Sequence, residues 1–217
     1  MAAPSPPPPS LPLPAPDAPR PHILLGLTGS VASIKAPPLA RALCELGTVR
    51  VVATEAARHF FDEAELPEAA RPVLGSEAEW RGWRRVGDPV LHIELRKWAD
   101  LLVIAPVSAD ALAKVSLGLA DDLLTCVARA WDFSSSAPGA PPRFPLLLAP
   151  AMNTAMWDHP ATAEHLRRVR AWGADVIPPV AKTLACGDVG VGAMASVEDV
   201  RNAVRDALDR NRGEGRG

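Results

Sequence analysis

The sequence predicts a three-layer, Rossmann-like α/β fold, in which helices cover both faces of a parallel sheet. Nearly continuous apolar runs alternate with helix-like runs along the chain. Such apolar runs are typical of parallel strands that are buried on both faces. Polar and glycine residues gather where these runs end. Ligands bind beside the carboxyl ends of the strands in open parallel sheets, so we expect the functional site at that edge.

The predicted strands are the apolar runs at residues 22–29, 49–54, 101–107, 144–152 and 174–180. The predicted helices lie at residues 31–46, 76–85, 108–131, about 160–172 and 196–208, and a short helix opens near residue 57. Pro37 and Pro38 interrupt the first helix, which therefore either kinks or begins there. Gly118 divides the segment 108–131 into two helices.

Two helix starts carry capping signals. Ser76 as N-cap and Glu79 three residues later predict a capping box. Ser196 is the expected N-cap of the closing helix, whose apolar face comprises Val197, Val200, Val204 and Leu208.

The bulk composition limits the possible functions. The chain has 217 residues, 48% of them hydrophobic, and a net charge of −2, which gives no electrostatic case for nucleic-acid binding. No apolar run approaches the roughly 18 residues that cross a bilayer. We expect a disordered proline-rich leader at residues 1–21, one domain at 22–210 and a flexible tail at 211–217. The leader resembles no secretory signal, so we expect a cytoplasmic protein without membrane or nucleic-acid partners.

The three cysteines are too few and too scattered for a disulfide framework or a metal site, and we expect no metal. Cys44 and Cys126 lie in helix-like patterns and are expected to pack in the core. Cys186 differs, because it lies in the glycine-rich stretch "LACGDVGVGAM", where a thiol has little to pack against.

Three stretches carry possible chemistry. Gly29 and Ser30 mark a strand-to-helix turn, which either binds phosphate or simply caps the helix. His92 suits acid–base work near neutral pH, although a lone histidine is more often structural. Asn153, in "APAMNTAMWDHP", follows a predicted strand, and its amide could hold a carboxylate or amide through both donor and acceptor. Methionines beside it could pack on a flat ring.

Taken together, "GSVA", "DPVLHIELRKWAD", "PAMNTAMW" and "ACGDVGVGAMA", in this order, closely resemble the phosphopantothenoylcysteine decarboxylases, a group of homo-oligomeric flavin-containing cysteine decarboxylases. The resemblance covers nearly all of the chain except the leader and the last few residues. It implies a flavodoxin-like form of the predicted fold, FMN as cofactor and a homotrimer with FMN near a subunit interface.

The implied reaction converts 4′-phosphopantothenoylcysteine to 4′-phosphopantetheine and CO2 in coenzyme A synthesis. The cysteinyl thiol is oxidised to a thioaldehyde, which accepts the electrons released as CO2 departs. The resulting enethiol is then reduced again.

The resemblance also assigns roles to residues. His92 matches the catalytic base and Cys186 the proton donor of the final reduction. The matching substrate-binding positions are Asn153, Met156, Thr183 and Ala185. The matching FMN positions are Gly29, Ser30, Val31, Ala32, Thr54, Glu55, Ala56, Ser108, Ala109, Asp110, Ala111 and Ala151. For Met152 and Trp157, packing and function are equally good interpretations.

Some residues depart from the pattern. Asp110 and Ala111 replace an amide and a hydroxyl, and Asp122 replaces a second amide. A carboxylate facing flavin or its phosphate would weaken binding unless it is paired or protonated. Thr183 stands where relatives often carry a basic residue, so a contact with the substrate phosphate is either missing or made elsewhere.

Rival interpretations remain open. Some relatives are non-enzymatic subunits that inhibit a protein phosphatase, but this chain has His92, Asn153 and Cys186 together and no acidic tail. Decarboxylation of another cysteinyl substrate, such as a peptide, is the second alternative. A flavin prenyltransferase is disfavoured by the Cys186 loop, and an electron-transfer flavodoxin would need no pair of Asn153 and Cys186.

Overall fold

A five-stranded parallel sheet forms the centre of the computed structural model, which describes residues 20–135, 142–183 and 189–214. The strand order is β2-β1-β3-β4-β5, and every neighbouring pair is parallel. The strands are β1 His22–Leu27, β2 Thr48–Ala53, β3 Leu101–Val107, β4 Leu146–Pro150 and β5 Asp175–Val176. The predicted fold class is therefore confirmed.

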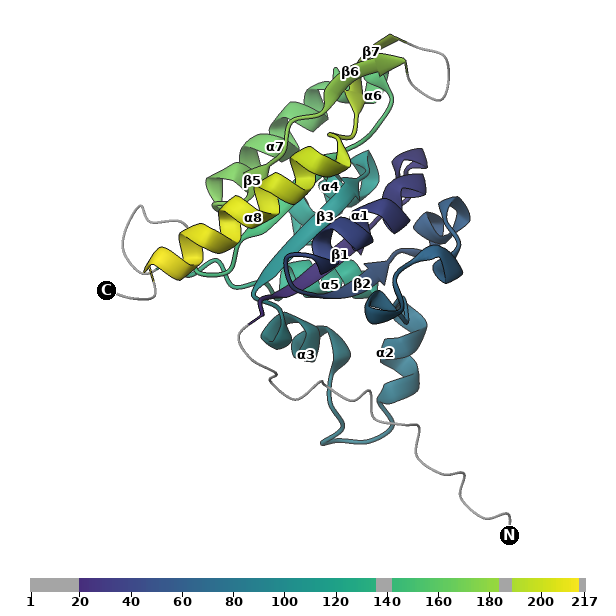
Figure 1. Cartoon of the computed structure of the whole chain (residues 1–217), viewed down its shortest axis with the longest axis vertical. Helices are drawn as coiled ribbons and strands as arrows, with labels where there is room; N and C mark the ends of the chain where they lie inside the picture. Colours follow the sequence, from purple (N-terminus) through teal and green to yellow (C-terminus); the bar gives the residue numbers. More distant parts are fainter. Residues whose placement is uncertain (1–19, 136–141, 184–188, 215–217) are drawn as a thin grey trace.

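Helices cover both faces of this sheet, so two apolar layers form (Figure 1). The side chains of Ile23, Leu25 and Leu27 pack with the face covered by α1 (Ala36–Cys44) and α8 (Val197–Glu214). Leu24, between them, points to the opposite layer, as the two-residue period of a strand requires. The helices of that second layer are α3 Leu91–Trp98, α4 Ala109–Leu117, α5 Leu123–Arg129 and α7 Pro160–Ala171.

Several element boundaries follow the predicted signals. The 3₁₀ helix η1 (Val31–Lys35) precedes α1, so the prolines mark the start of the α-helix. Gly118 ends α4 in the left-handed conformation, with φ of 74°. The Ser196 hydroxyl accepts a hydrogen bond from the Asp199 N–H at 3.0 Å, which confirms the cap of α8. The helix expected near residue 57 is the 3₁₀ helix η2 (Glu55–Phe60).

Short helices fill the path from β2 to β3. They are η3 Glu63–Glu65, η4 Glu68–Ala70 and α2 Ser76–Gly82. The capping box predicted for α2 is wrong. Gly75 is its N-cap, and the Ser76 hydroxyl instead accepts a hydrogen bond from the Leu123 N–H at 3.1 Å. The Glu79 side chain turns to His92, on α3.

The strand predicted at residues 174–180 is also partly wrong. Only β5 joins the sheet, because Pro178 and Pro179 have no N–H to continue the ladder. The chain then forms a separate antiparallel hairpin of β6 (Val180–Thr183) and β7 (Val189–Ala193). This hairpin lies beside the one-turn helix α6 (Thr154–Trp157), away from the main sheet (Figure 1).

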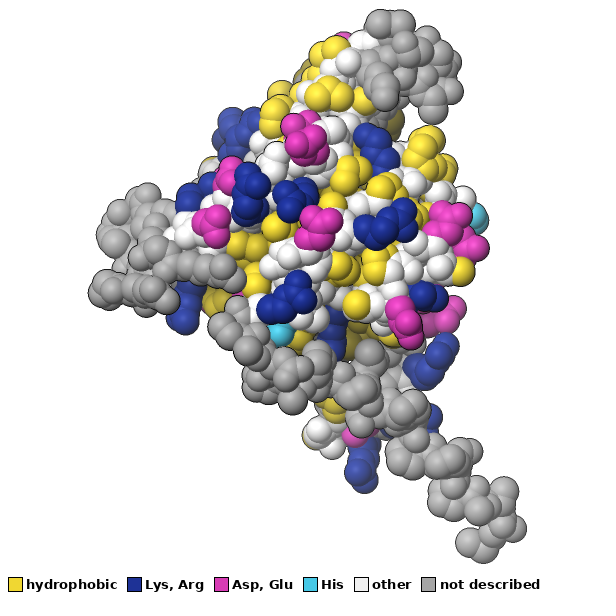
Figure 2. All heavy atoms as spheres, in the orientation of Figure 1, with side chains coloured by type: hydrophobic (Ala, Val, Ile, Leu, Met, Phe, Trp, Pro, Cys, Tyr) yellow, Lys and Arg dark blue, Asp and Glu magenta, His cyan; other side chains and the backbone are white. Residues whose placement is uncertain are grey.

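Acidic and basic side chains are interspersed on the face that α1 and α8 cover (Figure 2). Among the described helices, none is long and apolar enough to span a membrane. Cys44 and Cys126 are free thiols, and Cys44 packs against the core beneath α1 and α8. Cys126 is half-buried and lies near Glu79 and His92.

Candidate active site

Three capped turns line the carboxyl edge of the sheet. Ser30, Thr54 and Ser108 follow β1, β2 and β3, and each is the N-cap of the next helix. Their hydroxyls accept hydrogen bonds from backbone N–H groups at 3.2 to 3.3 Å. The remaining N–H groups of such first turns have no partner within the helix, so this edge suits an anionic or hydrogen-bonding ligand.

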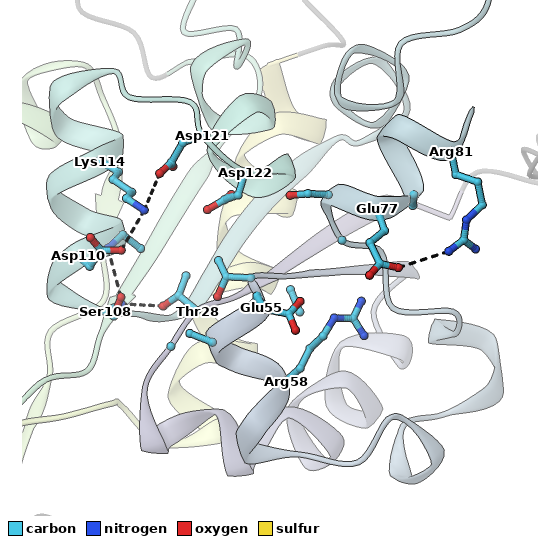
Figure 3. A pocket seen from close by; sticks show the side chains of 18 residues that line it. Thr28, Glu55, Arg58, Glu77, Arg81, Ser108, Asp110, Lys114, Asp121 and Asp122 are labelled. Carbon is cyan, nitrogen blue, oxygen red and sulfur yellow. Dashed lines mark hydrogen bonds and ion pairs between the residues drawn. The ribbon is translucent and has the colours of Figure 1, made fainter. Parts of the chain in front are cut away.

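Thr28 ties two of these turns together. Its side chain is buried, donates a hydrogen bond to the Pro106 carbonyl at 2.9 Å and accepts one from the Ser108 N–H at 2.8 Å. The end of β1 is therefore fixed to the start of α4 by one hydroxyl (Figure 3). This residue has no signal in the sequence beyond following an apolar run.

Gly29 is required by close packing. A Cβ atom at Gly29 would lie 2.7 Å from the Cβ of Ala56, which is shorter than real contacts of this kind. The turns after β1 and β2 therefore touch, and only glycine leaves room for both. This supports the prediction that Gly29 and Ala56 belong to one site.

Two adjoining cavities open at this edge and share Gly29, Ser108 and Asp110. The first, which we call the polar cavity, has a volume of about 720 Å³ and is also lined by the Thr54–Ala56 turn and the start of α2. The second, the apolar cavity, has about 530 Å³. Its apolar lining includes Val31, Ile34, Phe60, Met152, Met156 and Met194.

Charges in the polar cavity are largely paired (Figure 3). Lys114 contacts Asp121 at 2.9 Å and Asp110 at 3.3 Å. The hydrogen bond to Asp121, and then that to Asp110, raise the pKa of Lys114. The same contact with Lys114 lowers the pKa of Asp121. Arg81 pairs with Glu77 at 3.3 Å.

The two carboxylates that replace amides both have structural partners. Asp110 is exposed and pairs with Lys114. Asp122 is the N-cap of α5, where its side chain accepts a hydrogen bond from the Thr125 N–H at 2.8 Å within a capping box. Asn and Asp are equally good N-caps, so this replacement keeps the local structure.

The turn with the sequence PAMN (residues 150–153), which we call the PAMN turn, forms one wall of the apolar cavity. Ala151, Met152, Asn153 and Met156 all line it. Asn153 is the N-cap of α6, and its side-chain oxygen accepts a hydrogen bond from the Ala155 N–H at 2.8 Å. Met156 is half exposed at this wall.

Met152 is buried, lines the apolar cavity and packs in the second core layer. Trp157 packs against that layer and lines neither cavity, so packing is the better interpretation for it.

The glycines of β7 explain part of the "GDVGVGAM" pattern. Gly192 accepts a hydrogen bond at its carbonyl from the Met152 N–H at 2.9 Å. A Cβ at Gly192 would lie 2.3 Å from the Met152 carbonyl oxygen, and one at Gly190 would lie 2.6 Å from Thr154 Oγ1. The hairpin therefore packs directly on the PAMN turn. Met194, just after β7, also lines the apolar cavity.

The predicted cofactor positions lie around the two cavities. The predicted positions that line the polar cavity are Gly29, Thr54, Glu55, Ala56, Ser108, Asp110 and Ala111. Those that line the apolar cavity are Gly29, Ser30, Val31, Ala32, Ser108, Ala109, Asp110 and Ala151. Thr183 ends β6, where its backbone pairs with Val189. Ala185 and Cys186 lie outside the described residues.

His92 lies apart from these groups. It is near the start of α3, and neither of the two cavities formed by the described residues includes it. Its Nδ1 contacts the buried carboxylate of Glu79. Arg96, one turn further on, pairs with Asp132 at 2.7 Å, and Lys97 pairs with Glu94 at 3.1 Å. Sequence reasoning missed α3 and the pairing of Glu79.

Comparisons with known proteins agree with this geometry. The family model described as Flavoprotein matches residues 14–209. The phosphopantothenoylcysteine decarboxylase of Oryza sativa subsp. japonica is 47% identical over 201 residues, which are 93% of this chain and 87% of that protein.

Two solved structures are similar as well. One is a cysteine-to-serine mutant of PPC decarboxylase complexed with pantothenoylaminoethenethiol, with a TM-score of 0.82 and 46% identity, covering 88% of this chain and 99% of that one. The other is the FMN-binding protein AtHal3, with a TM-score of 0.79 and 46% identity, covering 88% and 98%. The chain therefore belongs to the Flavoprotein family, in its group of phosphopantothenoylcysteine decarboxylases.

Proposed function

We propose that this protein is an FMN-dependent decarboxylase that converts 4′-phosphopantothenoylcysteine to 4′-phosphopantetheine and CO2 in coenzyme A biosynthesis. The main observation in support of this function is that the PAMN turn lines one of two adjoining cavities. The chain is also 46% identical to a PPC decarboxylase of known structure. A nucleotide-like cofactor and a thiol substrate both need room at one edge, and the shared residues Gly29, Ser108 and Asp110 join the two spaces.

The residues at this edge suit FMN. Capped turns at Ser30, Thr54 and Ser108 offer backbone N–H groups to polar atoms and phosphate, and the apolar cavity offers side chains that can cover a flat ring. The residues proposed to hold it are Gly29–Ala32, Thr54–Ala56, Ser108–Ala111 and Ala151. When bound, FMN supplies a reversible two-electron oxidant for the cysteinyl side chain of the substrate.

Asn153 is proposed to hold the carboxylate and amide of the substrate. The cap that its oxygen makes with the Ala155 N–H fixes the plane of the amide group, so the side chain is held in one orientation. A preorganised amide loses less conformational entropy when it binds a planar group. Met156, half exposed on the same wall, is proposed to pack on the substrate.

His92 is proposed as the catalytic base and Cys186 as the donor of the last proton. The neighbouring structure that carries a cysteine-to-serine mutation is complexed with an ethenethiol. A compound at this level of oxidation is what remains when decarboxylation has occurred but the final reduction has not. This supports a cysteine acting late in the reaction. Thr183 and Ala185 are proposed to contact the same substrate.

We also propose a homotrimer in which His92 of one chain completes the apolar cavity of another. Two features support this: His92 lines neither cavity of its own chain, and Val31, Ile34 and Met156 are exposed at the rim of the apolar cavity. A second copy would cover those apolar side chains. The free thiols of Cys44 and Cys126 are consistent with a cytoplasmic location, which we likewise propose.

A mass-spectrometric assay tests the reaction. The purified, FMN-loaded protein is incubated with 4′-phosphopantothenoylcysteine, and we expect loss of CO2 with formation of saturated 4′-phosphopantetheine. Cys186→Ser should stop at the enethiol, and His92→Asn should prevent CO2 loss while FMN stays bound. A folded, FMN-loaded protein that releases no CO2 would refute the proposed function.

Complementation tests the shared site. His92→Asn and Asn153→Ala chains should each be inactive alone, and their co-assembly should restore part of the activity, because one mixed interface then carries both intact residues. No recovery in verified mixed oligomers would show that His92 serves its own chain.

A further inference from the structure

One acidic side chain on the short helix α2 is unusually placed. Glu79 is only 8% exposed and is the sole charged residue buried among the described residues. A buried carboxylate is costly unless it is paired and hydrogen-bonded. Its side-chain partner is His92 Nδ1, on a different helix and 13 positions further along the chain. The fold therefore keeps a carboxyl group in its interior, in contact with this one imidazole.

The contact joins two elements that are otherwise held independently. Helix α2, which carries Glu79, is fixed by the hydrogen bond from the Leu123 N–H to Ser76 Oγ. Helix α3, which carries His92, is fixed by the pair between Arg96 and Asp132. Because each helix has its own attachment, the pair of Glu79 and His92 is not needed to bring the helices together. A role in orienting the imidazole explains it better.

The chemistry of this arrangement is specific. A carboxylate accepts hydrogen bonds, so it selects the imidazole tautomer that carries its proton on Nδ1. The Nε2 atom then holds the lone pair that a general base needs. When Nε2 takes up a proton, the adjacent carboxylate stabilises the imidazolium ion.

We propose that Glu79 is a positioning residue for His92, which it holds in the Nδ1–H tautomer with Nε2 available to accept a proton. This inference depends on the proposed role of His92 as the base. Glu79 lines neither cavity, so it acts through His92 and makes no direct contact with ligands there.

Cys126 is the third member of the cluster. Its Sγ lies within 4.8 Å of the nearest ligand atoms of Glu79 and His92. Burial, and then the charge of Glu79, raise the pKa of the Cys126 thiol. A thiol with a raised pKa stays protonated and uncharged, so the carboxylate of Glu79 keeps the imidazole of His92 as its charged or polar partner. A metal ion held by all three side chains is the competing explanation, and the experiment separates the two.

The test compares Glu79→Gln with Glu94→Gln, the same chemical change at a partly exposed glutamate on α3 that pairs with Lys97. In the FMN-loaded protein, Glu79→Gln should lower kcat about 100-fold, within the range that a general base contributes. The KM and the FMN content should stay within about twofold, since a group that acts through His92 contributes mainly in the transition state. Glu94→Gln should match the wild type.

A spectroscopic measurement does not depend on activity. The ¹⁵N shifts of His92, assigned by comparison with His92→Asn, should report the Nδ1–H tautomer in the wild-type protein and its loss in Glu79→Gln. An Nε2–H tautomer in the wild type would overturn the proposal even if Glu79→Gln failed to fold. A normal kcat in Glu79→Gln, with His92→Asn inactive, would overturn it as well.

Two further results would count against the proposal in different ways. Activity lost both on chelation and in Cys126→Ser would replace the proposal with a metal site. Full activity of His92→Asn would instead refute the role of His92 in the proposed function, whatever the tautomer. Insensitivity to chelators and normal kcat in Cys126→Ser are the results expected here.

Discussion

Gly192→Ala should damage the active site through the backbone of the PAMN turn. Gly192 has φ of 148°, which L-residues rarely adopt, and its missing Cβ would lie 2.3 Å from the Met152 carbonyl oxygen. Ordinary contact begins at 3.4 Å. The hairpin and the turn must therefore separate by about 1 Å, the difference between these two distances, because neither contact atom is the end of a flexible side chain.

The magnitude follows from this displacement. Residues forced into an unfavourable backbone conformation cost about 1–3 kcal/mol. The bond from the Met152 N–H to the Gly192 carbonyl, at 2.9 Å, would weaken and add up to about 1 kcal/mol. Asn153 is next to Met152 on the turn, and a misplacement of about 1 Å in a positioning group can cost about 100-fold in rate. We expect kcat/KM to fall by about that factor.

Steady-state kinetics and urea unfolding of the FMN-loaded protein measure the two effects. Gly82→Ala is the matched control, because a Cβ there meets nothing within 4 Å. It should leave both kinetics and stability close to the wild type. Wild-type kcat/KM in Gly192→Ala, with unchanged unfolding, would refute the claim that hairpin contact positions the PAMN turn.

Three other predictions concern the carboxyl edge of the sheet. Thr28→Val should lower the free energy of unfolding by about 1–3 kcal/mol and weaken FMN binding, because the part-buried Ser108 N–H and the buried Pro106 carbonyl both lose their partner. Unchanged urea unfolding and FMN titration would contradict this. Asp110→Asn should tighten FMN by less than about fivefold, because Lys114 already pairs with this exposed carboxylate, and a larger gain by fluorescence titration would show an unscreened charge. Asp122→Ala should cost about 1 kcal/mol in unfolding while Asp122→Asn should be nearly neutral, and an equal loss in both would mean that charge rather than capping matters.

The structure also changes the interpretation of Asp110 and Asp122, the two carboxylates that replace amides. From the sequence alone, each is a negative charge close to the site of an anionic cofactor. In the fold, Asp122 is used as a cap, and Asp110 shares the ammonium group of Lys114 with Asp121. Because a charge matters according to its partners and exposure, the sequence could raise the question but not answer it.

The sequence by itself determined the class of fold, most of the strands and the edge of the sheet at which the two cavities lie. Strands buried on both faces leave continuous apolar runs, and a parallel sheet brings their carboxyl ends to one edge, so local patterns were enough to group the turns at Gly29, Thr54, Ser108 and Asn153. The four motifs "GSVA", "DPVLHIELRKWAD", "PAMNTAMW" and "ACGDVGVGAMA" indicated the family, whose model matches residues 14–209.

Only the tertiary structure decided the details that depend on partners far along the chain. Glu79 carries a good local capping signal, yet its side chain is used by His92, since burying the carboxylate beside an imidazole outweighs one exposed cap. The sequence pattern indicated a glycine-rich loop where the structure forms β7, because the hairpin is placed by packing of Gly190 and Gly192 on the PAMN turn. Local periodicity indicates which face of a segment is buried. It does not indicate which residues that face packs against, and those contacts assemble the site.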